Sequence, residues 1–346
     1  MLKQYDYLPD KLLSLQAHQL ADSLPGPSLI HLPGRKQPPL FVSVLMHGNE
    51  QVGWEAIRLL LRRYQGGKEL PRSLSIFIGN VSAATRHKRL LPGQPDYNRV
   101  WPGSELEESP EKQMMAQVVE IMRQRQPFAS VDVHNNTGLN PHYACVNRLH
   151  GPFLHLALLF SRTVVYFLRP KGVQSMAFAE LCPSVTLECG KVGSAYGVEH
   201  ALQYLEACLH LAEHPLHPVA HQDIDLFHTV AQVKITKDTS FGFIPNESQL
   251  VFDPDLDHMN FRELPVGTFL GWVNGRGLEA LEVRDESGSD VGCDYFHIEE
   301  GQLCLNRMVM PSMLTKDLEV IREDCLCYLM ERYMAHVDDD NQGGSE

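Results

Sequence analysis

The first two thirds of the sequence alternate between short apolar segments and longer segments with apolar residues at helical spacing. Residues 39–46 (PLFVSVLM) are apolar, and residues 52–64 carry apolar side chains three and four positions apart, which is typical of a buried strand followed by a helix. Ser109 and Pro110 are typical of the N-cap and first position of another helix. The same alternation predicts further strands at residues 73–80, 130–134, 143–147, 163–168 and 184–189, and further helices at residues 110–126, 153–161 and 195–213. This pattern favours an α/β fold with a mixed, mostly parallel sheet and helices on both faces.

The pattern changes after a proline-containing stretch at residues 215–218 (PLHP). Beyond it, short alternating segments such as residues 228–236 (HTVAQVKIT) are separated by turn residues, which is typical of short strands. We therefore expect two domains, at residues 1–221 and 222–337, of which the second is smaller and β-rich. Residues 338–346 (DDDNQGGSE) predict an acidic, disordered tail.

The charge balance argues against several classes of function. The chain has 30 Lys+Arg against 43 Asp+Glu, a formal net charge of −13, so a broad basic surface for nucleic acid is not expected. No apolar run approaches the ~20 residues that cross a bilayer, and the eight cysteines form no C-x-x-C pair. The N-terminus lacks a basic segment followed by an apolar run. We therefore expect a cytoplasmic protein that binds neither nucleic acid nor membrane.

Side chains of metal-binding type follow two of the predicted strands. His47 and Glu50 lie in the sequence HGNE directly after the strand at residues 39–46, and His134 ends the strand at residues 130–134. Ligands of open α/β sheets bind beyond the carboxyl ends of the strands. Two histidines and one carboxylate are the ligand set of a catalytic zinc site that keeps a position for water. Because 17 histidines make an H-x-x-E pattern common by chance, this prediction depends on the second strand-end histidine.

Glu188 lies near the end of a third predicted strand, residues 184–189. A carboxylate there is placed to take a proton from zinc-bound water and to pass it to a leaving group, as a general base and acid. The alternative is an ordinary polar residue exposed at a strand end. The coincidence of four such residues favours the catalytic interpretation.

A loop rich in proline and glycine, residues 89–103, carries Arg89, Asn98 and Arg99. The planar fork of donors on arginine matches a carboxylate, and asparagine adds a neutral donor beside it. These residues predict a small anionic substrate. The alternative is a solvated basic surface that includes Arg86.

Four short motifs follow one another along the chain: HGNE at residues 47–50, DYNR at 96–99, DVHN at 132–135 and TLECG at 186–190. In this order they resemble the succinylglutamate desuccinylase/aspartoacylase family, which is related to the zinc carboxypeptidases. The resemblance covers residues 41–190, and weaker similarity to the smaller domain of the family lies at residues 260–261, 267–270 and 294–296. It implies a zinc carboxypeptidase-like catalytic domain at residues 1–221.

The resemblance also implies the zinc chemistry. His47, Glu50 and His134 would hold one zinc ion per chain, and Glu188 would activate the water that attacks an amide carbonyl. The implied function is a zinc-dependent deacylase that cleaves the amide bond of a small anionic N-acyl amino acid.

The same resemblance implies the substrate contacts. Arg89 would stabilise the oxyanion of the tetrahedral intermediate, and Asn98 and Arg99 would bind a carboxylate of the substrate. Tyr295 would contact the substrate from the second domain. The gap between Arg89 and Asn98 is longer than in the family pattern, so Arg86 is an alternative for the oxyanion role.

One departure from the family concerns the substrate. Family members of known substrate carry an arginine shortly before the catalytic glutamate, whereas residues 176–180 here read MAFAE. Lys171 and Arg169 are alternatives for this missing arginine. The DVHN motif also differs from the D-L-H-T form of desuccinylases. Both differences preserve the zinc chemistry and weaken the expectation of N-acetylaspartate or N-succinylglutamate as substrate.

Two alternatives remain open. The first is a zinc carboxypeptidase acting on a peptide or peptidoglycan fragment, against which the smaller domain argues, because in the family it narrows the channel. The second is a non-catalytic metal-binding protein on the same scaffold, against which the complete set of ligands and base argues. The sequence leaves open the acyl group, the amine, the native metal and whether the chain forms a homo-oligomer.

Overall fold

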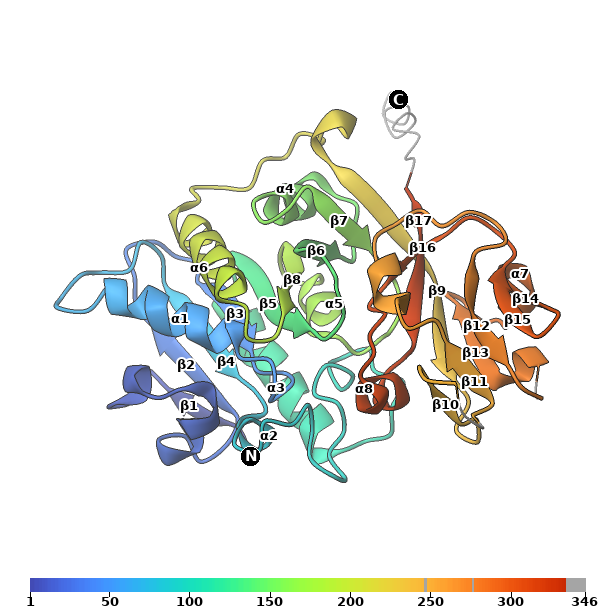
Figure 1. Cartoon of the computed structure of the whole chain (residues 1–346). Helices are drawn as coiled ribbons and strands as arrows, with labels where there is room; N and C mark the ends of the chain where they lie inside the picture. The colour runs from blue at the N-terminus through green and yellow to red at the C-terminus, as the bar shows by residue number, and fades with distance from the viewer. Residues whose placement is uncertain (246–247, 276, 334–346) are drawn as a thin grey trace.

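The computed structural model describes residues 1–245, 248–275 and 277–333, and within them the chain forms a 12-stranded and a five-stranded sheet (Figure 1). The predicted tail at residues 338–346 lies outside the described residues. All eight cysteines are free. Within the part of the chain that the structure describes, no helix combines the length and the apolar character that a membrane span requires.

The larger sheet has the order β1-β2-β4-β3-β5-β8-β6-β7-β9-β17-β16, and β13 also pairs with β9. Its strands are β1 (Lys3–Tyr5), β2 (Ser28–Leu32), β3 (Leu40–Val44), β4 (Leu74–Ile78), β5 (Ala129–Asn136), β6 (Tyr143–Val146), β7 (Thr163–Tyr166), β8 (Ser184–Lys191), β9 (Asp225–Ile235), β13 (Leu281–Asp285), β16 (Met310–Ser312) and β17 (Cys327–Arg332). The central strands β4, β3, β5 and β8 are parallel to one another, whereas β6 joins β8 in the antiparallel direction. The predicted mixed, mostly parallel sheet is confirmed.

Helices cover both faces of this sheet (Figure 1). They are α1 (Val52–Arg63), α2 (Val81–Ala84), α3 (Pro110–Arg125), α4 (Gly151–Leu158), α5 (Gln174–Phe178) and α6 (Ala195–His210), followed by α7 (Gly292–Tyr295) and α8 (Leu318–Glu323) in the C-terminal region. The predicted start of α3 is confirmed, because the Ser109 hydroxyl accepts a hydrogen bond from the backbone N–H of Lys112 and Pro110 is the first helical residue.

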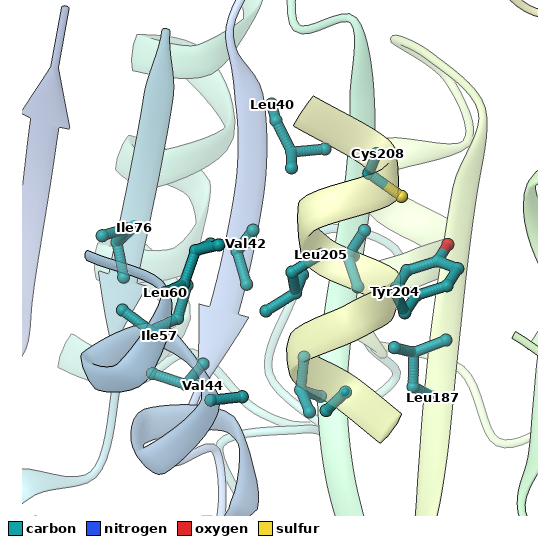
Figure 2. Close-up of a cluster of buried hydrophobic side chains, with 14 of the residues drawn as sticks. Leu40, Val42, Val44, Ile57, Leu60, Ile76, Leu187, Tyr204, Leu205 and Cys208 are labelled. Carbon is teal, nitrogen blue, oxygen red and sulfur yellow. The ribbon is translucent and has the colours of Figure 1, made fainter. Parts of the chain in front are cut away.

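One face of the sheet is packed by α1 and α6. Figure 2 shows Leu60 of α1 beside Val42 of β3 and Ile57 next to Leu60 on the same helix, while Leu205 of α6 lies between β3 and Leu187 of β8. All five side chains are fully buried. This apolar layer holds the helices in place and so supports the strands that carry the candidate site.

The opposite face is packed by aromatic and methionine side chains. Phe41, which alternates with Val42 along β3, stacks on Phe178 of α5 with ring centroids 4.2 Å apart. Trp101 meets the edges of Phe77 and Phe178 at 5.7 Å and 6.0 Å, and is fully buried. Because Trp101 belongs to the loop at residues 89–103, this packing fixes the loop against the sheet.

The C-terminal region contributes to both sheets. Strand β9 pairs in parallel with β7 and in the antiparallel direction with β13 and β17, so it extends the larger sheet beyond residue 222. The smaller sheet has the order β10-β11-β12-β15-β14, with bounds Phe241–Gly242, Leu250–Phe252, Phe269–Val273, Gln302–Leu305 and Phe296–Glu299 in that order. The β-rich C-terminal region is therefore present as predicted.

Candidate metal centre and active site

The predicted site residues meet at one edge of the larger sheet. Strands β3, β5 and β8 are neighbours and parallel, so their carboxyl ends lie together. His134 of β5 is paired in register with Glu188 of β8. His47 and Glu50 lie in the loop that leaves β3. The four side chains are all buried, with at most 7% of each residue exposed.

The HGNE loop is shaped by two backbone features. Leu45, directly after β3, adopts a positive φ of 57°, an uncommon conformation for a residue with a Cβ, which turns the chain out of the strand. Gly48 packs against the backbone of α2, where an added Cβ would lie only 2.3 Å from the N atom of Ala84. The backbone N–H of Gly48 also donates to the carbonyl of Arg89 at 3.0 Å. The glycine therefore brings this loop and Arg89 together.

Three side chains form a compact candidate metal centre. Nδ1 of His47 lies 2.7 Å from Oε1 of Glu50, and Nδ1 of His134 lies 2.7 Å from Oε2 of Glu50. One ligand atom from each of the three residues lies within 4.8 Å of the others. Two imidazole nitrogens and a carboxylate oxygen therefore converge on one small volume.

The opposite nitrogen of each imidazole faces another carboxylate. Nε2 of His134 lies 2.8 Å from Oδ2 of Asp132, whose other oxygen accepts a hydrogen bond from the Ser43 hydroxyl at 2.6 Å. Nε2 of His47 lies 3.1 Å from Oδ1 of Asp96. Histidines that bind metal commonly donate their second N–H to a carboxylate, which fixes the ring and its tautomer. Both rings are therefore oriented with Nδ1 towards Glu50.

In the metal-free centre, protons on the two histidines balance the negative charge of the neighbouring carboxylates. Burial alone would lower the pKa of His134, but the carboxylates of Asp132 and Glu50 raise it well above the ordinary value. The pKa of His47 is also raised, because Glu50 and Asp96 outweigh burial and the nearby charge of Arg89. The pKa of Glu50 is lowered despite its burial, because both imidazoles face it. A cation at this place would take over the role of these protons.

The residues present fit a zinc ion. The donor set is two imidazole nitrogens and one carboxylate, which is the set of many catalytic zinc sites. The facing geometry already exists, and each histidine has a carboxylate behind it. In addition, Oε2 of Glu188 is buried and has no hydrogen-bond partner among the described residues.

Burial governs the ionisation of Glu188. Desolvation raises its pKa to about 8, while the charge of His134 acts in the opposite direction. A cation bound beside it would lower this pKa and favour the carboxylate. Glu188 therefore lies in a dry position where its protonation depends on its neighbours, as a general base requires.

Two arginines lie beside the metal centre and share one acidic partner. The guanidinium of Arg89 lies 2.9 Å from Asp96 and 3.1 Å from Asp324, and 3.7 Å from Glu50. The guanidinium of Arg99 lies 2.8 Å from the other oxygen of Asp324. Although burial would raise the pKa of Asp324, Arg99 and Arg89 lower it. Asp324 is therefore ionised and bridges the two arginines.

A cavity of about 100 Å³ connects these groups. Its polar lining includes the metal centre, Glu188, the two arginines, Asn98 and Asp324. Much of the remaining lining is apolar, and includes Tyr143, Cys145, Val165, Phe167, Val173 and Met313. The cavity can therefore accommodate a small molecule next to both Glu188 and the candidate metal centre.

The structure brings seven of the eight predicted site residues to this cavity: His47, Glu50, Arg89, Asn98, Arg99, His134 and Glu188. Their roles remain predictions. Tyr295 is not brought there: it lies in α7 within the apolar core of the C-terminal region, with the guanidinium of Arg307 5.1 Å above its ring. The substrate contact expected of Tyr295 has no support in this arrangement, because its side chain is committed to that core.

The structure also shows where the alternative cationic residues named from the sequence lie relative to the cavity. Arg86 is exposed, whereas Arg89 lines the cavity, so the geometry favours Arg89 for a role near the metal centre. Arg169 lines the cavity, but its guanidinium contacts Glu105 at 3.1 Å. Lys171 contacts the same Glu105 at 2.9 Å and does not line this cavity.

Three acidic residues of the site were missing from the sequence prediction. Asp96 and Asp132 stand in the DYNR and DVHN motifs, so their position two residues before Asn98 and His134 was a usable signal. Asp324 lies between α8 and β17 and belongs to no motif. Within the sequence, nothing near Asp324 indicates that it reaches two arginines more than 220 positions earlier; its separation from Arg99 is 225 residues.

Comparison with known proteins supports this interpretation of the fold. The family model described as the succinylglutamate desuccinylase/aspartoacylase catalytic domain matches residues 36–214. No curated protein matches the chain. Similar solved structures include succinylglutamate desuccinylase/aspartoacylase from Rhodobacter sphaeroides, at 17% identity and TM-score 0.56 over 88% of each chain. Succinylglutamate desuccinylase from Vibrio cholerae has 15% identity and TM-score 0.56, over 87% of this chain and 84% of that chain. The Chromobacterium violaceum desuccinylase has 18% identity and TM-score 0.51, over 68% of this chain and 76% of that chain.

Proposed function

The chain belongs to the succinylglutamate desuccinylase/aspartoacylase family, and on that premise we propose that it is a zinc-dependent hydrolase that cleaves the amide bond of a small N-acyl compound, such as an N-acyl amino acid. The observation that carries the proposal is the convergence of His47, Glu50 and His134, with Glu188 paired in register beside His134. These four side chains supply a metal site and a buried base next to one cavity.

The three ligand residues would hold the ion through Nδ1 of His47, Nδ1 of His134 and the carboxylate of Glu50. When bound, zinc supplies a Lewis acid that polarises a carbonyl and lowers the pKa of water towards ~7. Asp96 and Asp132 keep the two imidazoles oriented through Nε2.

Glu188 takes the proton from the attacking water and passes it to the nitrogen of the departing amine. The carboxylate is suited to this role because it is buried and because its Oε2 atom has no hydrogen-bond partner within the described part of the protein. The attack converts the planar carbonyl into a tetrahedral centre with negative charge on oxygen. Nη1 of Arg89 lies 3.7 Å from Oε1 of Glu50, while Nη2 contacts Asp96 and Asp324, so Nη1 is the cationic group placed to stabilise that charge.

The carboxypeptidase alternative receives less support. A carboxypeptidase would use the same metal centre and base on a larger acyl group, and the cavity of about 100 Å³ fits a small substrate better than a peptide. A panel of N-acyl amino acids and dipeptides of matched size separates the two activities. Faster hydrolysis of the dipeptides would favour the peptidase.

The test of the proposal begins with metal content. We would purify the protein without a histidine tag and measure zinc by elemental analysis in wild type, in His134→Ala and in His214→Ala as a matched control. Nε2 of His214 donates to the backbone carbonyl of Phe128 at 2.9 Å, and its ring stacks on that of Phe128, at the opposite end of β5 from His134. About one zinc per chain in wild type and control, lost in His134→Ala, is expected.

The same preparations are then assayed for release of amine from N-acyl amino acids. Zinc-dependent hydrolysis by wild type and by His214→Ala, absent in His134→Ala, supports the proposal. Bound zinc without hydrolysis of any amide would instead indicate a non-catalytic protein on this scaffold, and absence of zinc from wild type after zinc addition would overturn the metal site.

A further inference from the structure

The cations of the cavity are all neutralised from within the chain. Arg89 and Arg99 share the carboxylate of Asp324, with N–O distances of 3.1 Å and 2.8 Å. The third arginine that lines the cavity, Arg169, contacts Glu105 through both terminal nitrogens, at 3.1 Å and 3.3 Å. No arginine of the lining therefore lacks an acidic partner in the described part of the chain.

The carboxylate of Asp324 lies between two guanidinium groups, where the carboxylate of a ligand could otherwise bind. Each of its oxygens faces a different guanidinium, and its side chain is 14% exposed. Arginine pairs of this kind bind carboxylates of ligands. Here the carboxylate belongs to the protein.

The segment that carries Asp324 is anchored on both sides. Before it, Ile321 of α8 is buried in the C-terminal core, and Arg322 donates to three backbone carbonyls of residues 236–239. After it, the backbone N–H of Leu326 donates to a carbonyl of β9, and β17 begins. These contacts hold Asp324 against the arginines as part of the folded structure, and not as a loose lid.

A large part of the cavity lining is apolar. Tyr143 and Cys145 of β6 lie opposite Glu188 and Thr186 of β8 in the antiparallel ladder, so they stand beside the predicted base. Val165, Phe167 and Met313 complete this apolar lining. An acyl chain that extends from the scissile carbonyl along this lining meets carbon and sulfur atoms.

We propose that Asp324 is a specificity-determining residue: its carboxylate fills the anion-binding position between Nη2 of Arg89 and Nη2 of Arg99, so the enzyme selects amides with an uncharged, apolar acyl group. A substrate carboxylate at that position meets a carboxylate of the protein and has no free cation. The inference deepens the proposed function and rests on it, because it names the substrate class of the same site.

The first test is a set of matched substrates for the zinc-loaded wild type. N-butyryl and N-succinyl alaninamide share the amine, and differ by the methyl or carboxylate end of the acyl chain. We expect kcat/KM for the butyryl compound to exceed that for the succinyl compound by about tenfold or more, because the succinyl carboxylate would be buried without a cationic partner, which costs at least this factor. Equal or faster hydrolysis of the succinyl compound overturns the proposal. This comparison needs no variant.

The second test uses Asp324→Asn, which keeps the shape and removes the charge. Its ratio of succinyl to butyryl kcat/KM should rise by about tenfold or more over wild type. Glu319→Gln is the matched control, since Glu319 lies on α8 and contacts Lys88 on the surface, and its ratio should equal that of wild type. An unchanged ratio in Asp324→Asn, with folding checked by circular dichroism, contradicts the proposal.

A binding measurement separates this inference from the proposed function. Succinate is titrated calorimetrically into zinc-loaded wild type and Asp324→Asn. We expect Asp324→Asn to bind succinate at least about tenfold more tightly. If no amide is hydrolysed, the proposed function fails, while this titration still decides the role of Asp324: equal affinities overturn it and tighter binding by the variant supports it.

Discussion

His134 and Glu188 are partners in register on the adjacent parallel strands β5 and β8, so one rung of the sheet carries both a predicted metal ligand and the predicted base. Neighbouring strands lie about 4.8 Å apart, and the hydrogen bonds of the ladder fix that separation. The relative placement of the two side chains is therefore a property of the sheet, which does not depend on a mobile loop. The predictions below follow from this arrangement and from the groups around it.

Glu188→Gln should remove activity and keep the metal. The amide cannot take the proton from water, so kcat should fall by about 10²-fold or more. Zinc content should stay at the wild-type value, because Glu188 is not one of the three converging ligands. Steady-state kinetics and elemental analysis measure both. Glu199→Gln, on the exposed surface of α6, is the control; wild-type kcat in Glu188→Gln would exclude the assigned role.

The metal-free protein should show a pH-dependent effect of the same substitution on stability. Burial raises the pKa of Glu188 from 4.5 to about 8, so below pH ~4.5 both folded and unfolded chains hold the proton. Between these values only the folded chain holds it, and wild type loses about 1.4 kcal/mol of unfolding free energy per pH unit relative to Glu188→Gln. Above pH ~8 the difference becomes constant.

Urea unfolding of EDTA-treated wild type and Glu188→Gln, at pH values from 4 to 9, measures this difference. Wild type and Glu188→Gln share all their other titrating groups. The contributions of groups that do not contact Glu188 to the pH dependence of the unfolding free energy therefore cancel in the difference. A difference that stays level between pH 5 and pH 8 would show that Glu188 is not held in a desolvating environment.

Zinc binding should release protons. In the metal-free centre the carboxylates of Asp132, Glu50 and Asp96 outweigh burial and raise the pKa of His134 and His47, so these imidazoles keep protons to a higher pH. Zinc requires the neutral rings, and its apparent affinity should therefore rise with pH. Calorimetric titrations at pH 7 in buffers of different ionisation enthalpy count the released protons. Equal heats in all buffers would contradict the protonated centre.

Asp132→Asn should weaken zinc binding without removing a ligand. Asp132 contacts Nε2 of His134 at 2.8 Å, and loss of such a partner typically lowers metal affinity about 10–100-fold. Competition with a chromophoric zinc chelator measures the change. Asp285→Asn, at an aspartate of β13 that does not line the cavity and does not contact His47, Glu50 or His134 in the described part of the chain, should keep the wild-type affinity. Equal affinity of all three proteins would show that Asp132 has no part in orienting His134.

Leu205→Ala tests the packing of α6 on the sheet. Leu205 is fully buried between the helix and the strands, and such truncations cost about 2–5 kcal/mol of unfolding free energy. Leu216→Ala, at a leucine that is 84% exposed, should change it by less than about 0.5 kcal/mol. Denaturant unfolding of the zinc-free proteins gives both values. A small effect at Leu205 would mean that α6 contributes little to the stability of the site.

The strands and helices that carry the metal centre could be predicted because their signals are local. The apolar run at residues 39–46 became β3, the helical spacing at residues 52–64 became α1, and Ser109 caps α3. His47 and His134 came together because parallel strands direct their carboxyl ends to one edge. Each of these inferences needs only neighbouring residues and a general rule of sheet topology.

Other parts of the structure depend on pairing between distant segments, which composition does not encode. The register of β17 on β9, which brings the C-terminal region into the larger sheet, joins segments about a hundred positions apart. Tyr295 was expected at the cavity from a weak similarity, but apolar packing in the C-terminal core holds it elsewhere. The contacts of Asp324 also result from this long-range pairing, since β17 follows it directly.

The late position of Asp324 in the chain has a consequence for biosynthesis. During translation, Arg89 and Arg99 are synthesised more than 220 residues before Asp324, which pairs with both. Strand β9 is likewise synthesised about a hundred residues before β17, with which it pairs. Until the segment with Asp324 and β17 emerges, Arg89 has only its contacts with Asp96 and Glu50, Arg99 lacks the carboxylate of Asp324, and β9 lacks one neighbouring strand. An unpaired strand edge can pair with another chain, which favours aggregation. The charge of the site is therefore completed at the end of translation. Given the role proposed for Asp324, a chain that stops before this residue would differ in ligand preference as well as in stability.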